Sequence, residues 1–136
     1  MKIPEDIVCL ICEEQIRQNG NFFPGEDYLQ KLSDKAECIV YYSPSGISGF
    51  VFFYCNDEKN FSSYISLLMV TCAERKKGVG AALIRSVLNF TKQKRFNYCR
   101  LEVRKENIAA IGLYKSMGFR SIEDRSDKYL MEATAS

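Results

Sequence analysis

The 136-residue chain contains no histidine. Ser-His-Asp and Cys-His nucleophile systems are therefore excluded, and acid–base work must fall to Glu, Asp, Tyr, Lys or Cys. No apolar run approaches eighteen residues and no signal-peptide pattern opens the chain, so we expect a cytosolic protein without a membrane span. The net charge of +2 is too small to indicate nucleic acid or a membrane surface as a partner.

Six cysteines are scattered along the chain, and only Cys9 and Cys12 form a CxxC pair. That pair lies in a helical pattern with no second pair, so neither a zinc site nor a redox motif is supported. We therefore expect no metal, and buried free thiols in a reducing cytosol. With 46% apolar and 26% charged residues, the composition predicts a single globular domain over residues 1–136.

Apolar periodicity predicts helices and strands along the whole chain. The expected helices lie at about 5–18, 26–33, 80–94 and 107–117. The expected strands lie at about 36–42, 47–55, 64–70, 98–104 and 129–131. This order predicts an α/β or α+β fold, a mixed sheet with helices on its faces, whose ligand site lies beyond the carboxyl ends of strands.

The segment "ERKKGVGAAL" follows the strand that ends near Val70. It lacks the GK[ST] of a P-loop, and Leu83 stands where a dinucleotide fingerprint needs its third glycine, so neither ATP nor NAD is supported. Gly78 and Gly80 let the backbone approach a ligand, and free N–H groups at a helix start suit a pyrophosphate. A solvated basic turn is the alternative, and the spacing alone leaves both open.

Two motifs together favour the phosphate site. Arg75-x-x-Gly78-x-Gly80 resembles the (Arg/Gln)-x-x-Gly-x-(Gly/Ala) loop of the GCN5-related N-acetyltransferases (GNAT). The later segment "LEVRKENIAAIGLYKSMGF" resembles the second hallmark of that family, in the correct order and separation. The resemblance spans about residues 36–131. It implies a GNAT fold, with a mixed, mostly antiparallel sheet flanked by helices and an N-terminal strand that is short or absent.

The resemblance implies an N-acetyltransferase of small bacterial type that uses acetyl-CoA as acetyl donor and an amine as acceptor. In the family the glycine loop binds the CoA pyrophosphate through backbone amides, and the preceding strand end pairs with the pantetheine arm. Asn107 matches a residue that hydrogen-bonds this arm, and helix N-capping is a second account of it that is compatible with the first. The residues expected at the cofactor are Leu68, Met69, Val70, Arg75, Lys76, Lys77, Gly78, Val79, Gly80, Ala81, Asn107 and Tyr114.

Tyr114 matches the general acid of the family. A phenol has an ordinary pKa of about 10, so it stays protonated at neutral pH and can donate to a departing thiolate. A tyrosine packed in the core is the alternative. By family analogy, the backbone N–H of Val70 is the expected oxyanion donor.

Glu102 is the candidate base. Strand alternation places it on one face with Arg100 and Arg104. The segment is similar to the GNAT branch that acetylates the N-terminal residue of a ribosomal protein, where the matching glutamate is the base. The equal alternative is a glutamate paired with neighbouring arginines, the amine losing its proton through water held by Tyr64 or Ser66.

Acceptor choice in the family lies in the N-terminal helices, here "GNFFPGEDYLQKL", which match the ribosomal-protein branch poorly. Phe22, Phe23 and Tyr28 either wall an acceptor cleft or pack as core, and an amino sugar fits the sequence as well as a peptide amine. The competing function is an acyl-CoA sensor or interaction module without turnover. Because family members often pair through C-terminal strands, a homodimer is expected.

Overall fold

The computed structural model describes residues 3–20 and 22–135, which divide into two compact units, 1–37 and 38–136. The first unit holds helices α1 (Glu5–Arg17) and α2 (Glu26–Lys35). Ile3 and Pro4 precede α1 without forming a strand, and the first two residues lie outside the described part. No helix within the described ranges has the length and apolarity to cross a membrane. That the two units form one catalytic domain stays a prediction.

In the first unit, Gln15 of α1 fastens the corner that follows this helix. Its Oε1 accepts hydrogen bonds from the backbone N–H groups of Phe22 (2.8 Å) and Phe23 (3.0 Å), and its Nε2 donates to the carbonyl of Phe23 (2.8 Å). Phe23 also stacks on Tyr28 of α2 at 6.1 Å between ring centroids. The three aromatics proposed from the sequence therefore gather at this corner.

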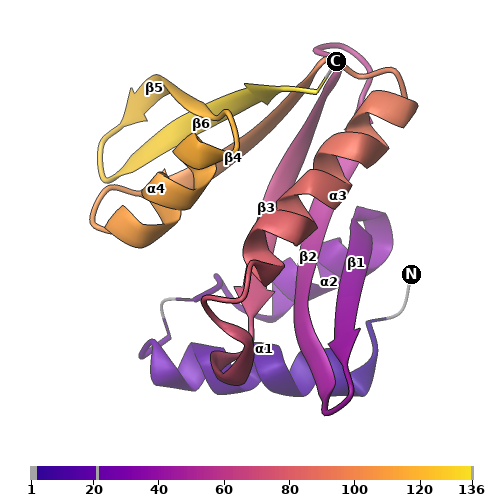
Figure 1. The fold of residues 1–136 in the computed structure, drawn as a ribbon, viewed down its shortest axis with the longest axis vertical. Helices are drawn as coiled ribbons and strands as arrows, with labels where there is room; N and C mark the ends of the chain where they lie inside the picture. The colour runs from indigo at the N-terminus through magenta and orange to yellow at the C-terminus, as the bar shows by residue number, and fades with distance from the viewer. Residues whose placement is uncertain (1–2, 21, 136) are drawn as a thin grey trace. The chain divides into compact units, whose positions relative to one another are not determined.

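The second unit is built on a six-stranded sheet in the order β1-β2-β3-β4-β6-β5 (Figure 1). The strands are β1 (Glu37–Ser43), β2 (Gly46–Asp57), β3 (Ser62–Val70), β4 (Tyr98–Arg104), β5 (Arg120–Arg125) and β6 (Lys128–Thr134). The pairs β2–β3, β4–β6 and β5–β6 are antiparallel, and β3–β4 is parallel. The predicted mixed, mostly antiparallel sheet is confirmed.

Strands β3 and β4 are paired over only part of their length. Their register runs from Ser62↔Tyr98 to Ile65↔Leu101 and stops there, although β3 continues to Val70. The two strands start side by side and then spread apart (Figure 1). A gap therefore opens in the sheet beside the carboxyl-terminal half of β3.

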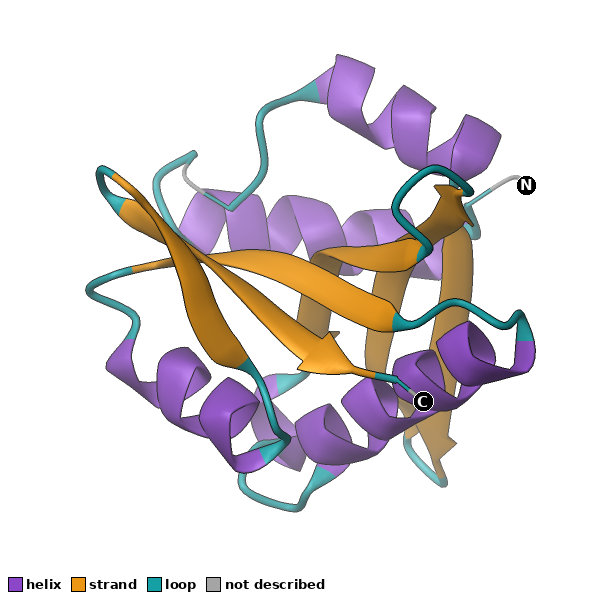
Figure 2. Ribbon diagram, turned by 90° about the horizontal axis from the view of Figure 1, so that it is seen from above, coloured by secondary structure: helices purple, strands orange, loops and turns teal. Residues whose placement is uncertain are grey.

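Helices α3 (Val79–Gln93) and α4 (Ile108–Ser116) both pack on one face of this sheet (Figures 1 and 2). Leu83 and Val87 form the buried stripe of α3 and lie in one cluster with Val51, Leu101 and Met131 of three strands. Apolar residues at helical spacing predict such a stripe. A short 3-10 turn, η1 (Cys72–Glu74), lies between β3 and α3. The short connection and the packing of α3 together place the start of the helix near the end of β3.

Most of the elements match the sequence expectations, and two expectations are wrong. Strand β5 was not predicted, because all six of its residues are exposed and leave no apolar alternation. The cysteines are free, but Cys9, Cys12 and Cys72 are exposed, and only Cys55 and Cys99 are buried. The helical pattern of the CxxC segment was read correctly, whereas its buried face runs through Ile7 and Ile11 instead.

Candidate active site

The end of β3 presents to the gap peptide groups that are not paired with a neighbouring strand. Thr71 donates its N–H to the carbonyl of Ser48 at 3.0 Å, so Thr71 and Ser48 form a hydrogen-bonded antiparallel pair. Such pairs alternate with pairs whose N–H and C=O groups point away from the partner strand. In the register of β2 and β3, Val70 and Leu68 take these outward positions. Their peptide groups therefore face the gap, whereas those of Met69 face β2.

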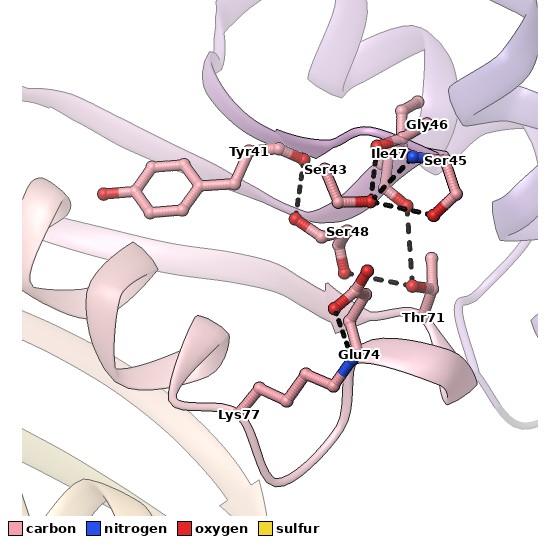
Figure 3. A network of polar contacts seen from close by, with 9 residues as sticks. All are labelled: Tyr41, Ser43, Ser45, Gly46, Ile47, Ser48, Thr71, Glu74 and Lys77. Carbon is pink, nitrogen blue, oxygen red and sulfur yellow. Dashed lines mark hydrogen bonds and ion pairs between the residues drawn. The ribbon is translucent and has the colours of Figure 1, made fainter.

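A polar network holds the turn between β3 and α3 (Figure 3). Thr71 Oγ1 donates to the carbonyl oxygen of Ser48 at 3.2 Å, and the Ser48 hydroxyl donates to the carbonyl of Tyr41 at 3.0 Å. Further along the turn, Lys77 Nζ lies 3.4 Å from Glu74 Oε2. The Thr71 contact anchors the start of the turn to the β1–β2 hairpin, and the Glu74–Lys77 ion pair lies within the turn itself.

Gly78 is the N-cap of α3 and has φ of 80°, in the left-handed region. This conformation favours glycine because a Cβ is strained there. Within residues 3–20 and 22–135, no side chain caps this end. The first N–H groups of a helix have no intrahelical acceptor, so those of Val79, Gly80 and Ala81 are available to an anion, and the helix dipole favours negative charge there.

Two glycines let the start of α3 come close to its neighbours. A Cβ on Gly49 of β2 would lie 2.8 Å from the Met69 carbonyl oxygen and 3.0 Å from Val79 Cγ1. A Cβ on Gly80 would lie 3.3 Å from Leu113 Cδ2 of α4. Gly80 thus makes room for α4 at the helix start. Gly49 was missed from the sequence, although an isolated glycine within a strand pattern indicates close approach of this kind.

The three basic residues before Gly78 are exposed. Arg75 Nε donates to the carbonyl of Val70 at 3.2 Å, which agrees with the outward orientation of that peptide group. Lys76 has φ of 65°, and Lys77 is paired with Glu74. The structure therefore brings these cations to the turn between the strand end and the helix start.

Asn107 precedes helix α4, and Tyr114 lies within it. Asn107 is the N-cap, and its Oδ1 accepts the N–H of Ala110 at 3.2 Å, so the capping alternative is confirmed. The Tyr114 ring packs on Phe119 at 5.9 Å between centroids, and burial raises the pKa of Tyr114 to about 12. Among the described residues no group hydrogen-bonds its hydroxyl, which is nevertheless not sealed from solvent. The phenol is a protonated donor without an internal acceptor.

Glu102 lies on β4 just past the last residue that pairs with β3. Tyr64 of β3 donates its hydroxyl to Glu102 Oε1 at 3.1 Å, and Arg125 Nη1 of β5 donates to Glu102 Oε2 at 3.4 Å. Glu102, Tyr64 and an arginine, the residues named in the two alternatives for the base, are thus joined by hydrogen bonds in one cluster. Arg125 was missed because β5 was missed, and the arginine that pairs with Glu102 is not a neighbour on its own strand.

The site lies in an α/β fold whose mixed sheet opens between two parallel strands, beside a helix that begins at a glycine. Residues 10–119 match the sequence profile of the Acetyltransferase (GNAT) family. The chain belongs to this family.

Solved structures share the fold. Ard1 from Thermoplasma volcanium superposes with a TM-score of 0.73 and 24% identity, covering 87% of this chain and 84% of that chain. The ribosomal-protein-S18-alanine N-acetyltransferase from Escherichia coli gives 0.70 and 19%, covering 85% and 81%. A Bacillus subtilis acetyltransferase in complex with CoA gives 0.70 and 16%, covering 82% and 84%. At these identities the likeness establishes the fold.

Curated relatives match over a shorter segment. The mouse protein "N-acetyltransferase family 8 member 3" is 33% identical over 63 residues, which is 46% of this chain. The chain spans only 28% of the length of that relative.

Proposed function

We propose that this protein is an acetyl-CoA-dependent N-acetyltransferase that acetylates the primary amine of a small molecule or peptide by direct attack on the thioester. One observation carries the proposal: the outward peptide groups of Leu68 and Val70 lie beside an uncapped helix N-terminus that starts at Gly78. An extended amide-containing chain that ends in a pyrophosphate satisfies both sets of donors.

The residues present fit coenzyme A. The amides of Val79, Gly80 and Ala81 would hold the pyrophosphate, with Arg75, Lys76 and Lys77 adding positive charge at the preceding turn. Leu68 and Val70 would hydrogen-bond the pantetheine arm. Met69 would not hydrogen-bond the arm, because its peptide groups are paired with β2; it only separates Leu68 from Val70 along the strand.

Acetyl-CoA, when bound, supplies an acetyl group activated as a thioester. The N–H of Val70 points into the gap and would stabilise negative charge on the carbonyl oxygen. The Tyr114 hydroxyl would give its proton to the departing sulfur, since burial keeps the phenol protonated at neutral pH. Asn107 fixes the first turn of the helix that carries Tyr114.

Glu102 would accept the proton of the attacking amine. Tyr64 and Arg125 hold its two oxygens and thereby orient the carboxylate at the point where β3 and β4 separate. A general base needs such positioning as much as it needs a suitable pKa. The competing proposal, a CoA-binding module without turnover, shares the helix site and differs only in requiring neither Tyr114 nor Glu102.

The deciding experiment is a thiol-release assay with acetyl-CoA and a panel of peptides, polyamines, amino sugars and amino acids, alongside calorimetry with CoA. We expect CoA to bind and one amine class to be turned over. Gly80→Trp should abolish CoA binding because a Cβ there already lies 3.3 Å from Leu113 Cδ2, so the indole must displace the helix start that carries the binding amides, whereas Asn89→Trp, exposed on the same helix, should not. Binding without turnover by any amine would favour the module, and no binding of CoA would refute both.

A further inference from the structure

A pocket lies on the sheet, next to Glu102. It has a volume of about 290 Å³ and is lined by Tyr54, Asn56, Asp57, Ser62, Ser63, Tyr64, Arg100, Arg125 and Leu130. Tyr64 and Arg125 line this pocket and are also the two residues that hold the Glu102 carboxylate. Ligand pockets typically span about 300–1,000 Å³, so this one suits a small ligand.

Arg100 carries the hydrogen-bonding capacity that is left in the pocket wall. Its Nε donates to Glu132 Oε2 at 2.8 Å, which anchors the guanidinium. In the part of the chain that the structure describes, its two terminal NH₂ groups have no hydrogen-bond partner. A guanidinium that is anchored through Nε and keeps both NH₂ groups available can donate two parallel hydrogen bonds to the oxygens of a carboxylate or phosphate.

Two hydroxyls of the wall are also without a partner among the described residues: those of Tyr54 and Ser62. Burial raises the pKa of Tyr54, so its phenol remains a donor at neutral pH. The Ser62 residue is buried, but its oxygen is not sealed from solvent. The open groups of the pocket are therefore chiefly donors.

The other charged groups of the pocket are already engaged. Arg125 is divided between Glu102 and Glu123, with Nε 2.9 Å from Glu123 Oε1. Asp57 accepts hydrogen bonds from the backbone N–H groups of Lys59 and Asn60 and from the Asn60 amide. Arg100 is thus the charged group of the wall whose hydrogen bonds are left for a ligand.

We propose that this pocket selects the acceptor, which is a small primary amine carrying a carboxylate or phosphate that Arg100 binds while the amine lies at Glu102. This inference rests on the proposed function. Arg100 and Glu102 are two residues apart on one face of β4, about 6.6 Å along the strand. The anion and the amine are therefore separated by a short chain, and a diamine of the same length is disfavoured because it places a cation against the guanidinium.

The test compares four amines of similar length at saturating acetyl-CoA: 5-aminopentanoate, 4-aminobutyl phosphate, 1-aminopentane and 1,5-diaminopentane. We expect kcat/KM for one of the two anionic amines to exceed that of the neutral and cationic ones by about 10- to 100-fold, the range of a charge-assisted hydrogen-bonded pair. Comparing the first two amines distinguishes carboxylate from phosphate. Equal or better use of the diamine would overturn the inference.

Variants locate the selectivity. Arg100→Gln should reduce the preference for the anionic amine to below about threefold, and Arg100→Lys should restore only part of it because the fork is lost. Arg104→Gln, on the same strand and face but outside the pocket, should keep the preference. A preference unchanged in Arg100→Gln contradicts the assignment.

Since Arg100→Gln also leaves Glu132 without its ion pair, Tyr54→Phe serves as a second variant that keeps the pair and removes one donor. It should lower the preference about threefold to tenfold.

Saturation-transfer NMR with 5-aminopentanoate and 4-aminobutyl phosphate tests binding in the pocket independently of turnover. If no amine is acetylated, the proposed function fails, while saturable binding of either compound that is lost in Arg100→Gln still supports the pocket. Absence of binding by both refutes it.

Discussion

Replacing Gly49 with alanine tests whether close approach of β2 to α3 fixes the cofactor site. The new Cβ would lie 2.8 Å from the Met69 carbonyl oxygen, 3.0 Å from Val79 Cγ1 and 3.1 Å from Leu83 Cδ1. The Met69 carbonyl oxygen is a backbone atom of a paired strand, so it cannot move away by a change of side-chain rotamer. The other two belong to the first turns of α3, so the helix start must move away from the sheet.

Overpacking of this kind typically costs about 1–3 kcal/mol. We expect Gly49→Ala to lower the free energy of unfolding by that amount, measured by urea denaturation as a shift in midpoint at constant slope. CoA affinity, measured by calorimetry, should fall as well, because the amides of Val79, Gly80 and Ala81 move with the helix.

Gly112→Ala is the matched control. A Cβ at Gly112 meets nothing within 4 Å, and this glycine lies inside α4. The same exchange should therefore stabilise the protein by about 0.5–1 kcal/mol, because alanine is the better helix former. If Gly49→Ala unfolds within about 0.5 kcal/mol of the wild type, the packing argument for the position of α3 is wrong.

The proposed catalytic roles give further predictions. Tyr114→Phe should lower kcat by about 100-fold or more, the usual contribution of a general acid, and leave CoA affinity within about twofold; wild-type kcat would remove Tyr114 from the mechanism. Since the pKa of Tyr114 is about 12, its acid form is lost only as the pH rises toward that value, so an alkaline limb near pH 9 would be assigned to another group. Glu102→Gln should lower kcat/KM and shift the pH–rate profile to higher pH, because the amine must then lose its proton to solvent. Tyr64→Phe should have a smaller effect, because Arg125 still holds the second carboxylate oxygen, and an unshifted profile in Glu102→Gln would favour another base.

The geometry of the candidate cofactor site was largely predictable because its signals are local. Gly78 and Gly80 follow a strand and open a helix, and this order of elements fixes the relation of strand end, turn and helix start. Asn107 likewise precedes a periodic segment and caps it, as its side chain predicts. What the sequence did not contain is the direction of individual peptide groups. Leu68 and Val70 face the gap and Met69 does not, which follows from the pairing of Thr71 with Ser48 in another strand.

The environment of the candidate base shows why the remainder could not be predicted. Alternation placed Glu102 on one face with Arg100 and Arg104, and it suggested a neighbouring arginine as partner. The partner is Arg125, on a strand whose residues are all exposed and carry no apolar pattern. Meanwhile Arg100, the residue expected beside Glu102, is anchored to Glu132, which lies directly opposite it on the neighbouring strand β6.

This exchange of partners has a chemical consequence. If Arg100 were paired with Glu102, as strand proximity suggests, the pocket wall would offer no open guanidinium. Because Arg125 takes the Glu102 carboxylate and Glu132 takes only the Nε of Arg100, the fork of Arg100 is left for a ligand. The unpredicted strand β5 therefore has two effects: its Arg125 holds the carboxylate of Glu102, the candidate base, and it leaves free the fork of Arg100, the cation that we propose selects the acceptor. Removing Arg125 should accordingly lower the turnover of every amine as well as the preference for anionic ones, whereas removing Arg100 should lower kcat/KM chiefly for the anionic amines.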